Sequence, residues 1–139
     1  MTLDNIPMSI TKLNCDYNLL CNLDNLFEHN NLKILSCNWN RITELYYLPD
    51  SLKKLYCSFN MLEKMDSFPP NLTYLDCSNN KINTLEYLPL NIKKIICHNN
   101  KLLSLNALPE SLEYLECYNN DIKNIDEIYD TYLNLEIIN

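Results

Sequence analysis

A fixed spacing of cysteine and asparagine runs along the chain and restricts its fold more than any other feature of the sequence. Six of the seven cysteines follow one another at intervals of 20 residues, after a first interval of 22, and an asparagine stands three positions after each. A constant period of this length is typical of a solenoid, in which one supersecondary unit is repeated and each copy packs on its neighbours. The cysteines are Cys15, Cys37, Cys57, Cys77, Cys97 and Cys117, and the asparagines are Asn18, Asn40, Asn60, Asn80, Asn100 and Asn120.

Each unit also carries apolar residues at fixed places. When a unit is numbered from its first leucine or isoleucine, apolar residues stand at positions 1, 4, 11, 14 and 17, cysteine at position 6 and asparagine at position 9. Side chains of a strand alternate between its two faces, so positions 4 and 6 are expected to point inward and positions 3, 5 and 7 outward. A short strand is therefore predicted in every unit, followed by a return segment.

The complete pattern is L-x-x-L-x-C-x-x-N-x-L-x-x-L-x-x-L-P-x-S/N. It resembles the leucine-rich repeat, in the short 20-residue variety with an L-P turn that is known from bacterial effector proteins. The resemblance covers residues 1–139, which are interpreted as a single leucine-rich-repeat domain with six near-complete repeats, a truncated first unit and a partial seventh strand. It implies a solenoid with a parallel β-sheet of about seven short strands on the concave face. It also implies extended or polyproline-II-like convex segments with little helix, because proline at position 18 fixes φ and removes a donor.

The C-terminal end of the array is the least regular part of the pattern. Ile137 stands 20 residues after Cys117, so a seventh strand is expected between Tyr132 and Ile138, with Ile137 at the cysteine position. An apolar strand at the end of a sheet offers an open edge to other chains. Either nearby polar residues blunt this edge, or it pairs with a second copy of the chain to form a homodimer.

The interval between the first two cysteines is longer than the others by two residues. The surplus lies in the stretch 26–32, which contains no proline, and a bulge is expected at the turn after position 17. Tolerated variation is the simpler interpretation. A local contact site that contains Phe27 and His29 is the alternative.

The charge of the chain excludes some kinds of partner. The net charge is −7, with −1 on residues 1–60 and −6 on residues 61–139. An acidic surface repels phosphate backbones, so no nucleic-acid partner is expected. No apolar stretch approaches the length of about 18 residues that a membrane span needs, so no membrane partner is expected either.

The composition also suggests where the protein works. The opening residues do not form the pattern of a signal peptide, and the number of cysteines is odd. Both features are typical of a reducing compartment, so we expect a cytoplasmic location, in the host cytoplasm if the protein is viral or an effector. The bias towards Asn, Ile, Leu, Lys and Tyr is typical of AT-rich coding sequence, as in large DNA viruses or protists.

The regular cysteines and asparagines are interpreted as structural ladders. Inward-pointing cysteines in a row do not converge as tetrahedral zinc ligands do, and a reduced cysteine packs as a small apolar side chain. Redox chemistry and metal binding are the minor alternatives. A position-9 asparagine can satisfy backbone groups of its own and the neighbouring unit. Because the chain contains no glycine, any backbone position with positive φ is expected to hold asparagine or aspartate.

No catalytic residue, metal site or cofactor is expected. His98 directly follows Cys97 in a predicted strand, so the two side chains point to opposite faces and cannot form a Cys–His nucleophile pair. A chain without glycine has none of the common phosphate-binding loops. The sequence therefore predicts a protein that is not an enzyme.

The surface that is available to a partner is the concave face, to which positions 3, 5, 7 and 8 of each unit are expected to contribute. At position 8 the first three units hold the aromatic residues Tyr17, Trp39 and Phe59, and the later units hold asparagine. Tyr56 and Tyr74 are expected nearby on the concave face. Tyrosine and tryptophan bury a large area with few rotatable bonds and are common anchors of interfaces. The alternative is that position 8 tilts into the edge of the solenoid and that the rings only pack on each other.

Two functions from different classes agree with these features. The first is a non-enzymatic protein–protein interaction module that binds a protein partner, a host protein being one candidate, on its concave face. The second is a structural protein that self-associates through uncapped solenoid ends. Recognition of carbohydrate or peptidoglycan is known for relatives of this fold and rests here on analogy alone.

Overall fold

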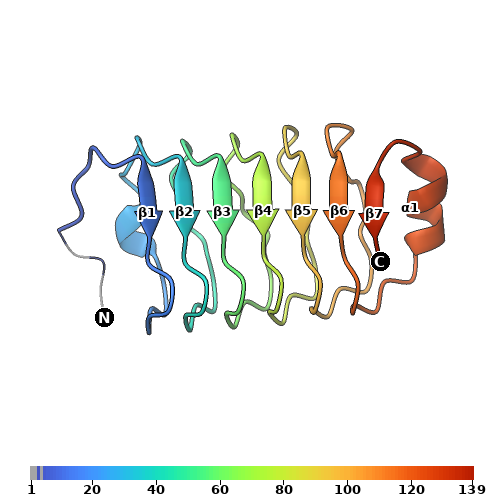
Figure 1. The fold of residues 1–139 in the computed structure, drawn as a ribbon, viewed down its shortest axis with the longest axis horizontal. Coiled ribbons are helices and arrows are strands. Elements are labelled where there is room, and N and C mark those ends of the chain that lie inside the picture. The colour runs from blue at the N-terminus through green and yellow to red at the C-terminus, as the bar shows by residue number, and fades with distance from the viewer. Residues whose placement is uncertain (1–2, 4) are drawn as a thin grey trace.

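The computed structural model describes residue 3 and residues 5–139, and within this part the chain forms a solenoid with a single sheet of seven parallel strands (Figure 1). The strands lie side by side in chain order. The solenoid expected from the repeat period is therefore confirmed. Its elements are β1 (Lys12–Asn14), η1 (Asp24–Leu26), β2 (Ile34–Ser36), β3 (Lys54–Tyr56), β4 (Tyr74–Asp76), β5 (Lys94–Ile96), β6 (Tyr114–Glu116), α1 (Ile125–Thr131) and β7 (Glu136–Ile138).

The register of the sheet repeats the sequence period. In the five strand pairs from β1–β2 to β5–β6, the position-4 residues stand opposite one another. The resulting column of inward residues is Leu13, Leu35, Leu55, Leu75, Ile95 and Leu115. Because side chains alternate along a strand, the flanking residues at positions 3 and 5 are presented on the concave face.

The register of β7 differs from the sequence-based expectation. Ile137 pairs with Leu115, so it occupies the leucine position, and the prediction that it takes the cysteine position was wrong. The cysteine position belongs to Asn139, whose Oδ1 lies 3.7 Å from Cys117 Sγ. The cause is α1, a helical return segment that lengthens the last interval to 22 residues.

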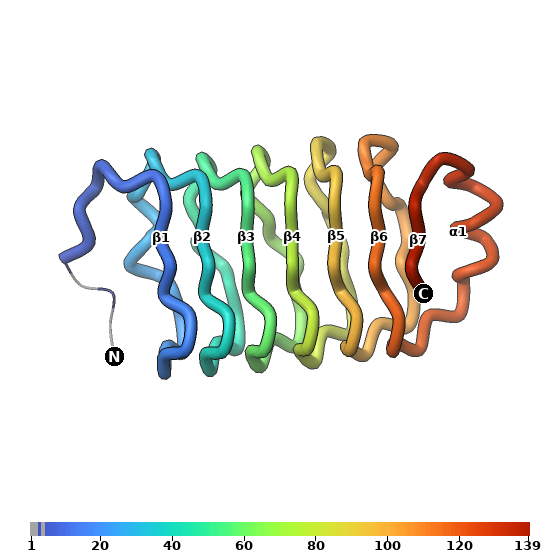
Figure 2. Tube along the Cα trace, viewed as in Figure 1, coloured from blue at the N-terminus to red at the C-terminus, as the bar shows by residue number. Residues whose placement is uncertain are grey.

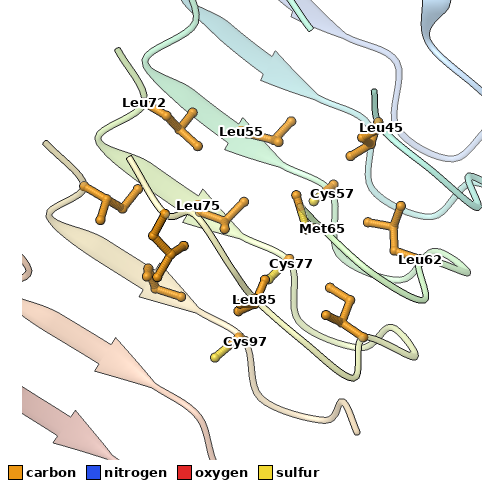
Figure 3. Packing of buried hydrophobic residues seen from close by; sticks show 14 of the residues in the cluster. Leu45, Leu55, Cys57, Leu62, Met65, Leu72, Leu75, Cys77, Leu85 and Cys97 are labelled. Atoms are coloured by element: carbon orange, nitrogen blue, oxygen red, sulfur yellow. The ribbon is translucent and has the colours of Figure 1, made fainter. Parts of the chain in front are cut away.

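The core lies between the sheet and the return segments. The leucines of position 4 and the cysteines of position 6 from the strands face position-14 residues from the convex side (Figure 3). In the middle repeats Leu55, Leu75, Cys57 and Cys77 have no exposed surface, and Met65 is 4% exposed. Burial of each such leucine or methionine side chain stabilises the fold by roughly 1.5–3 kcal/mol. The cysteine side chain is small and fully buried at this position in the middle repeats, so a larger residue is expected to overpack it.

The turn after each strand requires a left-handed backbone at position 8. All six position-8 residues have φ between 53° and 56°. The expectation that asparagine or aspartate would hold such positions is right for Asn79, Asn99 and Asn119, and for Asn5 outside this column. It is wrong for the aromatic residues of the first three repeats, and for Tyr87 and Ala107. Hydrogen bonds between successive turns impose this conformation, because the position-8 N–H donates to the position-7 carbonyl of the next repeat in each turn from the first to the fifth.

The convex side is irregular in the middle repeats and helical only near the two ends. Figure 2 shows the return segments of the middle repeats behind the strands, and α1 beyond β7 at the red end of the solenoid. Little helix was expected here and little is found. Ile128 of α1 is buried, and Tyr132 at its end donates a hydrogen bond of 2.6 Å to the carbonyl of Leu108. No helix in the described part of the chain is long and apolar enough to cross a membrane.

The two extra residues of the first interval are absorbed by η1 and the turn that follows it. The N–H of His29 donates to the carbonyl of Leu26 at 3.0 Å. His29 is 5% exposed, with its Nε2 3.2 Å from the carbonyl oxygen of Ile6, whereas Phe27 is 57% exposed. The alternative of a contact site shared by Phe27 and His29 therefore finds no support, because one side chain faces inward and the other outward.

Candidate functional site

The position-9 asparagines connect the repeats through their side-chain amides. Asn40 Nδ2 donates to the carbonyl oxygens of Cys15 and Cys37 at 3.0 Å each, and Asn40 Oδ1 accepts the N–H of Leu20 at 3.0 Å. The same set of bonds recurs at Asn60, Asn80, Asn100 and Asn120. Among the residues that the structure describes, the side chain of Asn18 donates only to the carbonyls of its own repeat. These amides are used by the backbone and are not presented to a ligand.

The position-6 cysteines lie in the core as protonated thiols. Cys37 Sγ donates to the carbonyl of Tyr56 at 3.3 Å, and Cys57 Sγ to that of Asp76 at 3.3 Å. Burial raises the pKa of the Cys15 and Cys117 thiols to about 11, with a smaller contribution from Asp16 at Cys15. Burial also raises the pKa well above the ordinary value in the thiols of Cys37, Cys57 and Cys97. A thiol held protonated is a poor nucleophile and a poor metal ligand. In the part of the chain that the structure describes, no three His, Cys, Asp or Glu residues are grouped to hold a metal ion.

The aromatic residues of position 8 form a continuous stack along the turns. The ring centroids of Tyr17 and Trp39 are 5.7 Å apart with planes 12° apart, and those of Trp39 and Phe59 are 3.8 Å apart with planes 8° apart. The exposed fractions are 77% for Tyr17, 46% for Trp39 and 39% for Phe59. The rings therefore pack on each other and remain accessible at the same time. We call these three residues the aromatic ladder.

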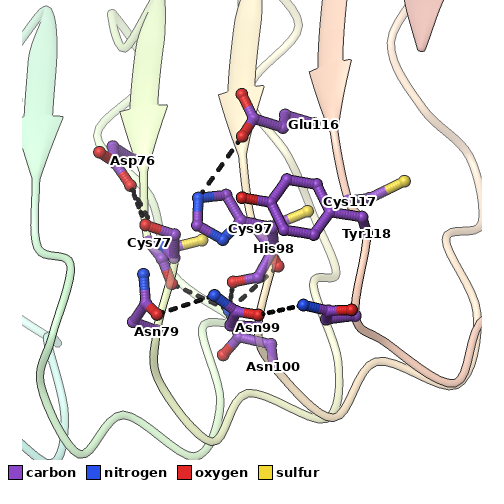
Figure 4. A network of polar contacts seen from close by, with 12 residues as sticks. Asp76, Cys77, Asn79, Cys97, His98, Asn99, Asn100, Glu116, Cys117 and Tyr118 are labelled. Atoms are coloured by element: carbon purple, nitrogen blue, oxygen red, sulfur yellow. Dashed lines mark hydrogen bonds and ion pairs between the residues drawn. The ribbon is translucent and has the colours of Figure 1, made fainter. Parts of the chain in front are cut away.

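The same column continues as a ladder of amides in the next three repeats (Figure 4). Asn99 Nδ2 donates to Asn79 Oδ1 at 2.9 Å, and Asn119 Nδ2 donates to Asn99 Oδ1 at 2.7 Å. Position 8 is thus apolar in the first three repeats and polar in the last three. The sequence showed this change of residue type, but the amide hydrogen bonds required the parallel register to be known.

Tyr56 and Tyr74 lie together on the concave face. Their ring centroids are 4.9 Å apart with planes 38° apart, and Lys54 Nζ lies 6.0 Å from the centroid of the Tyr74 ring. Burial raises the pKa of Tyr74 to about 12, with Asp76 as the next contribution, so its hydroxyl stays protonated and can donate. Among the described residues, neither ring stacks on the aromatic ladder.

A second cluster on the concave face was not singled out from the sequence. The ring of His98 stacks on Tyr118 with centroids 4.4 Å apart, and His98 Nε2 lies 3.5 Å from Glu116 Oε1 (Figure 4). Tyr114 donates to Glu116 Oε2 at 2.9 Å, and Lys94 Nζ lies 3.7 Å from the centroid of the Tyr114 ring. The signal available in the sequence was the aromatic residues at positions 3 and 7 of neighbouring units.

Comparisons with known proteins find similar folds among solved structures. No family model matches the sequence, and no curated protein matches it. The LRR domain of a Shigella effector aligns with a TM-score of 0.69 and 30% sequence identity, over 80% of this chain and 50% of that one. YopM from Yersinia enterocolitica aligns with a TM-score of 0.55 and 29% identity, over 86% of this chain and 35% of YopM.

A third similar structure is the functional domain of InlJ from Listeria monocytogenes, which includes a cysteine ladder. It aligns with a TM-score of 0.69 and 27% identity, over 94% of this chain and 32% of that one. This chain therefore spans half of the length of the Shigella structure and about a third of the other two. All three are leucine-rich-repeat proteins. Together with the sequence repeat and the parallel solenoid, these similarities identify the chain as a leucine-rich-repeat protein.

Proposed function

We propose that this chain is a non-enzymatic protein–protein interaction module that binds a protein partner through the aromatic side chains of its first repeats. Similarity to leucine-rich-repeat structures suggests an interaction module in general. The observation that carries the specific proposal is the exposed aromatic ladder of Tyr17, Trp39 and Phe59. Tyr56 and Tyr74 extend the contact onto the concave face.

Exposure of these rings to water is unfavourable unless something covers them. Apolar surface contributes about 25 cal/mol for each Å² that is removed from water, and aromatic residues are enriched at the centres of interfaces. Tyr17 and Phe59 stack on Trp39, which is still 46% exposed. The remaining exposed area is therefore a surface on which a partner can gain binding energy without first rearranging the chain.

Stability gives aromatic residues little advantage over asparagine at these positions, because the strain of the left-handed backbone offsets much of the gain from stacking. A residue with a bulky side chain in the left-handed region carries strain of about 1–2 kcal/mol, which asparagine tolerates better. Asn79, Asn99 and Asn119 hold the same backbone conformation and also form hydrogen bonds along the column. Strain that persists where a less strained residue fits is a reason to infer function.

The test is affinity capture from an extract of a candidate host cell. The wild-type chain is compared with a variant that carries Tyr17→Asn, Trp39→Asn and Phe59→Asn, because asparagine is the residue that this column uses in the later repeats. Tyr87→Asn is the matched control, since Tyr87 also has positive φ and is 80% exposed but lies outside the column. Far-UV circular dichroism and thermal unfolding verify that all three chains are folded.

We expect a protein partner to be retained by the wild type and by Tyr87→Asn, and to be lost from the triple variant. Equal recovery of that partner by the folded triple variant contradicts the assigned surface. Recovery of no protein other than the chain itself contradicts the module.

Self-association through the ends of the solenoid is the second candidate, and one observation favours it. The outer edges of β1 and β7 pair with no other strand of the described chain. Leu13 and Ile137 are accordingly only half-buried, whereas Leu35 to Leu115 of the same column have no exposed surface. Light scattering over a range of protein concentrations decides between the candidates, because a constant monomer mass contradicts self-association.

A further inference from the structure

We propose that the aromatic ladder is half of a wider docking surface on the turn side of the solenoid, and that this surface binds a partner segment with apolar side chains and at least one carboxylate. We call it the edge patch, and it consists of Tyr17, Leu19, Trp39, Arg41, Phe59 and Met61. The proposal rests on the proposed function, since it names the chemistry of the protein partner at that site.

Positions 8 and 10 flank the position-9 asparagine in each turn, and in the first three repeats the side chains at both positions are exposed. The asparagine between them points inward, where its amide binds the backbone, as Asn40 and Asn60 show. The N–H of Arg41 donates to the carbonyl of Leu20, and that of Met61 to the carbonyl of Ile42, both at 2.9 Å. Each of these bonds joins a repeat to the one before it, so the position-10 residues line up in a column that runs parallel to the aromatic ladder.

The position-10 side chains of the first three repeats are exposed. Leu19 is 59% exposed and Met61 43%, and Arg41 lies between them in the column and is also exposed. Together with the aromatic ladder they form two adjacent columns of exposed apolar residues with one cation in the middle. Aromatic residues, methionine and arginine are the residue types enriched in interfaces relative to other surfaces.

The patch ends where the residue types of both columns change. The next three repeats hold Asn79, Asn99 and Asn119 at position 8, and Lys81, Lys101 and Asp121 at position 10. The left-handed backbone of position 8 and the hydrogen bonds donated by the position-8 and position-10 N–H groups stay the same across this boundary for the fourth and fifth repeats. The change is therefore one of surface chemistry on a constant scaffold, which confines the edge patch to the first three repeats.

The electrostatics of the patch favour an acidic partner. The rings stack face to face, so the parts left exposed include their edges, which carry the positive end of the ring quadrupole. Arg41 adds a full positive charge and forms no ion pair within the described part of the chain. Asp16, the carboxylate beside the ladder, is engaged by Ser36 Oγ at 2.8 Å and by the N–H of Asn38 at 2.7 Å.

The distribution of charge over the whole chain agrees with this assignment. Residues 1–60 carry a net charge of −1 and residues 61–139 a net charge of −6. An acidic segment is repelled by the second half of the chain and much less by the first, so long-range forces direct it towards the edge patch. There the planar guanidinium of Arg41 can hold a carboxylate through two parallel hydrogen bonds, while the rings take the apolar side chains.

The experiment uses a phage-displayed library of random short peptides as the probe. The library is selected on the wild-type chain, and the peptides recovered are synthesised together with versions in which every Asp and Glu is replaced by Lys. Fluorescence anisotropy measures their affinity for the wild type, for Arg41→Glu and for Lys81→Glu. Lys81 is the matched control because it occupies position 10 in the next repeat, outside the edge patch.

We expect selected peptides to combine aromatic or aliphatic residues with Asp or Glu. Their affinity should fall by about tenfold or more on charge reversal of the peptide, and by a similar factor for Arg41→Glu, while Lys81→Glu has little effect. Selection of basic or uncharged peptides, selection of none, or equal binding by the wild type and Arg41→Glu overturns the proposal.

The outcome is separable from that of the proposed function. If the captured partner is lost from the triple asparagine variant but retained by Arg41→Glu, the result supports the interaction module and contradicts the proposal of an acidic partner segment. If acidic peptides bind through Arg41 but no protein is captured from the extract, the result supports the edge patch and contradicts the proposed function.

Discussion

The indole ring of Trp39 lies flat against the phenyl ring of Phe59, with centroids 3.8 Å apart and planes 8° apart. Both residues have positive φ, 54° and 53°. The corresponding contact two repeats later is a hydrogen bond of 2.9 Å between Asn79 and Asn99. One backbone geometry thus supports two kinds of ladder, and the residue type decides whether the turn edge is apolar or polar.

Substitution of Trp39 by asparagine should leave the stability nearly unchanged. The loss of its two stacking contacts, with Tyr17 and Phe59, costs about 1–3 kcal/mol, and relief of left-handed strain offsets about 1–2 kcal/mol of this cost. Trp39→Val loses the stack and places a β-branched residue in the left-handed region, so it should be about 2 kcal/mol less stable than Trp39→Asn. Urea unfolding followed by circular dichroism measures both. Equal stability of the two variants would show that the turn imposes no strain.

The position-9 asparagines that bond two repeats should each contribute more to stability than Asn18, which bonds only its own repeat. Asn80→Ala leaves the carbonyls of Cys57 and Cys77 and the N–H of Leu62 without their amide partner, and should cost roughly 3 kcal/mol. Asn18→Ala removes bonds only within its own repeat and should cost about 1 kcal/mol. The free energies of unfolding in urea compare the two. A larger loss for Asn18→Ala contradicts the role of these amides in joining repeats.

Stability should decrease in alkaline solution because of the buried cysteines. Burial raises the pKa of Cys15 and Cys117 from 9.0 to about 11. Above pH 9 the unfolded chain loses thiol protons that the folded chain keeps, so the unfolded state binds fewer protons and the free energy of unfolding falls as pH rises. The stability that these two thiols contribute is fully present below the thiol pKa of the unfolded chain, 9.0. It is lost as the pH rises through their pKa in the folded chain, about 11.

The measurement is the urea midpoint between about pH 8 and pH 10, where the native thiols remain protonated. Cys117→Ala is the control. Its urea midpoint should depend less on pH than that of the wild type, because this variant lacks one thiol with a raised pKa. A wild-type midpoint that does not change over this range would mean that the thiols are ionised equally in both states.

The hydroxyl of Tyr132 should hold the end of α1 against the preceding turn. Tyr132→Phe removes the hydrogen bond of 2.6 Å to the carbonyl of Leu108 and should cost about 1 kcal/mol. Tyr129→Phe is the matched control, since Tyr129 lies on α1 and is 45% exposed, and it should have no measurable effect. Thermal unfolding of the two variants provides the comparison, and equal melting temperatures contradict a role for this bond.

The error at β7 shows what a repeat pattern cannot predict. Ile137 lies 20 residues after Cys117, so extrapolation of the period placed it at the cysteine position. The last return segment folds into α1, which has a smaller rise per residue than an extended segment and needs two more residues to return to the sheet. Neither a cysteine nor a proline marks the register in this interval, so the sequence contained no signal of the shift.

The candidate site was predictable in its residue types and not in its contacts. Tyr17, Trp39 and Phe59 were placed in one column from the period alone, but the period does not state whether rings in a column stack, tilt inward or stay exposed. The pairing of His98 with Tyr118 was missed for the same reason. Such contacts depend on side-chain rotamers and on the distance between adjacent turns. Their role in binding stays a prediction.

The sequence by itself determined the repeating unit, the inward columns of leucine and cysteine, and the parallel order of the strands, because only a solenoid buries an apolar pattern with a constant period of 20 residues. The tertiary structure decided the register of β7, the left-handed backbone at the aromatic residues, and the exposure of the edge patch. These features follow from hydrogen bonds and packing between neighbouring repeats, in which each residue's conformation is set by residues about 20 positions away.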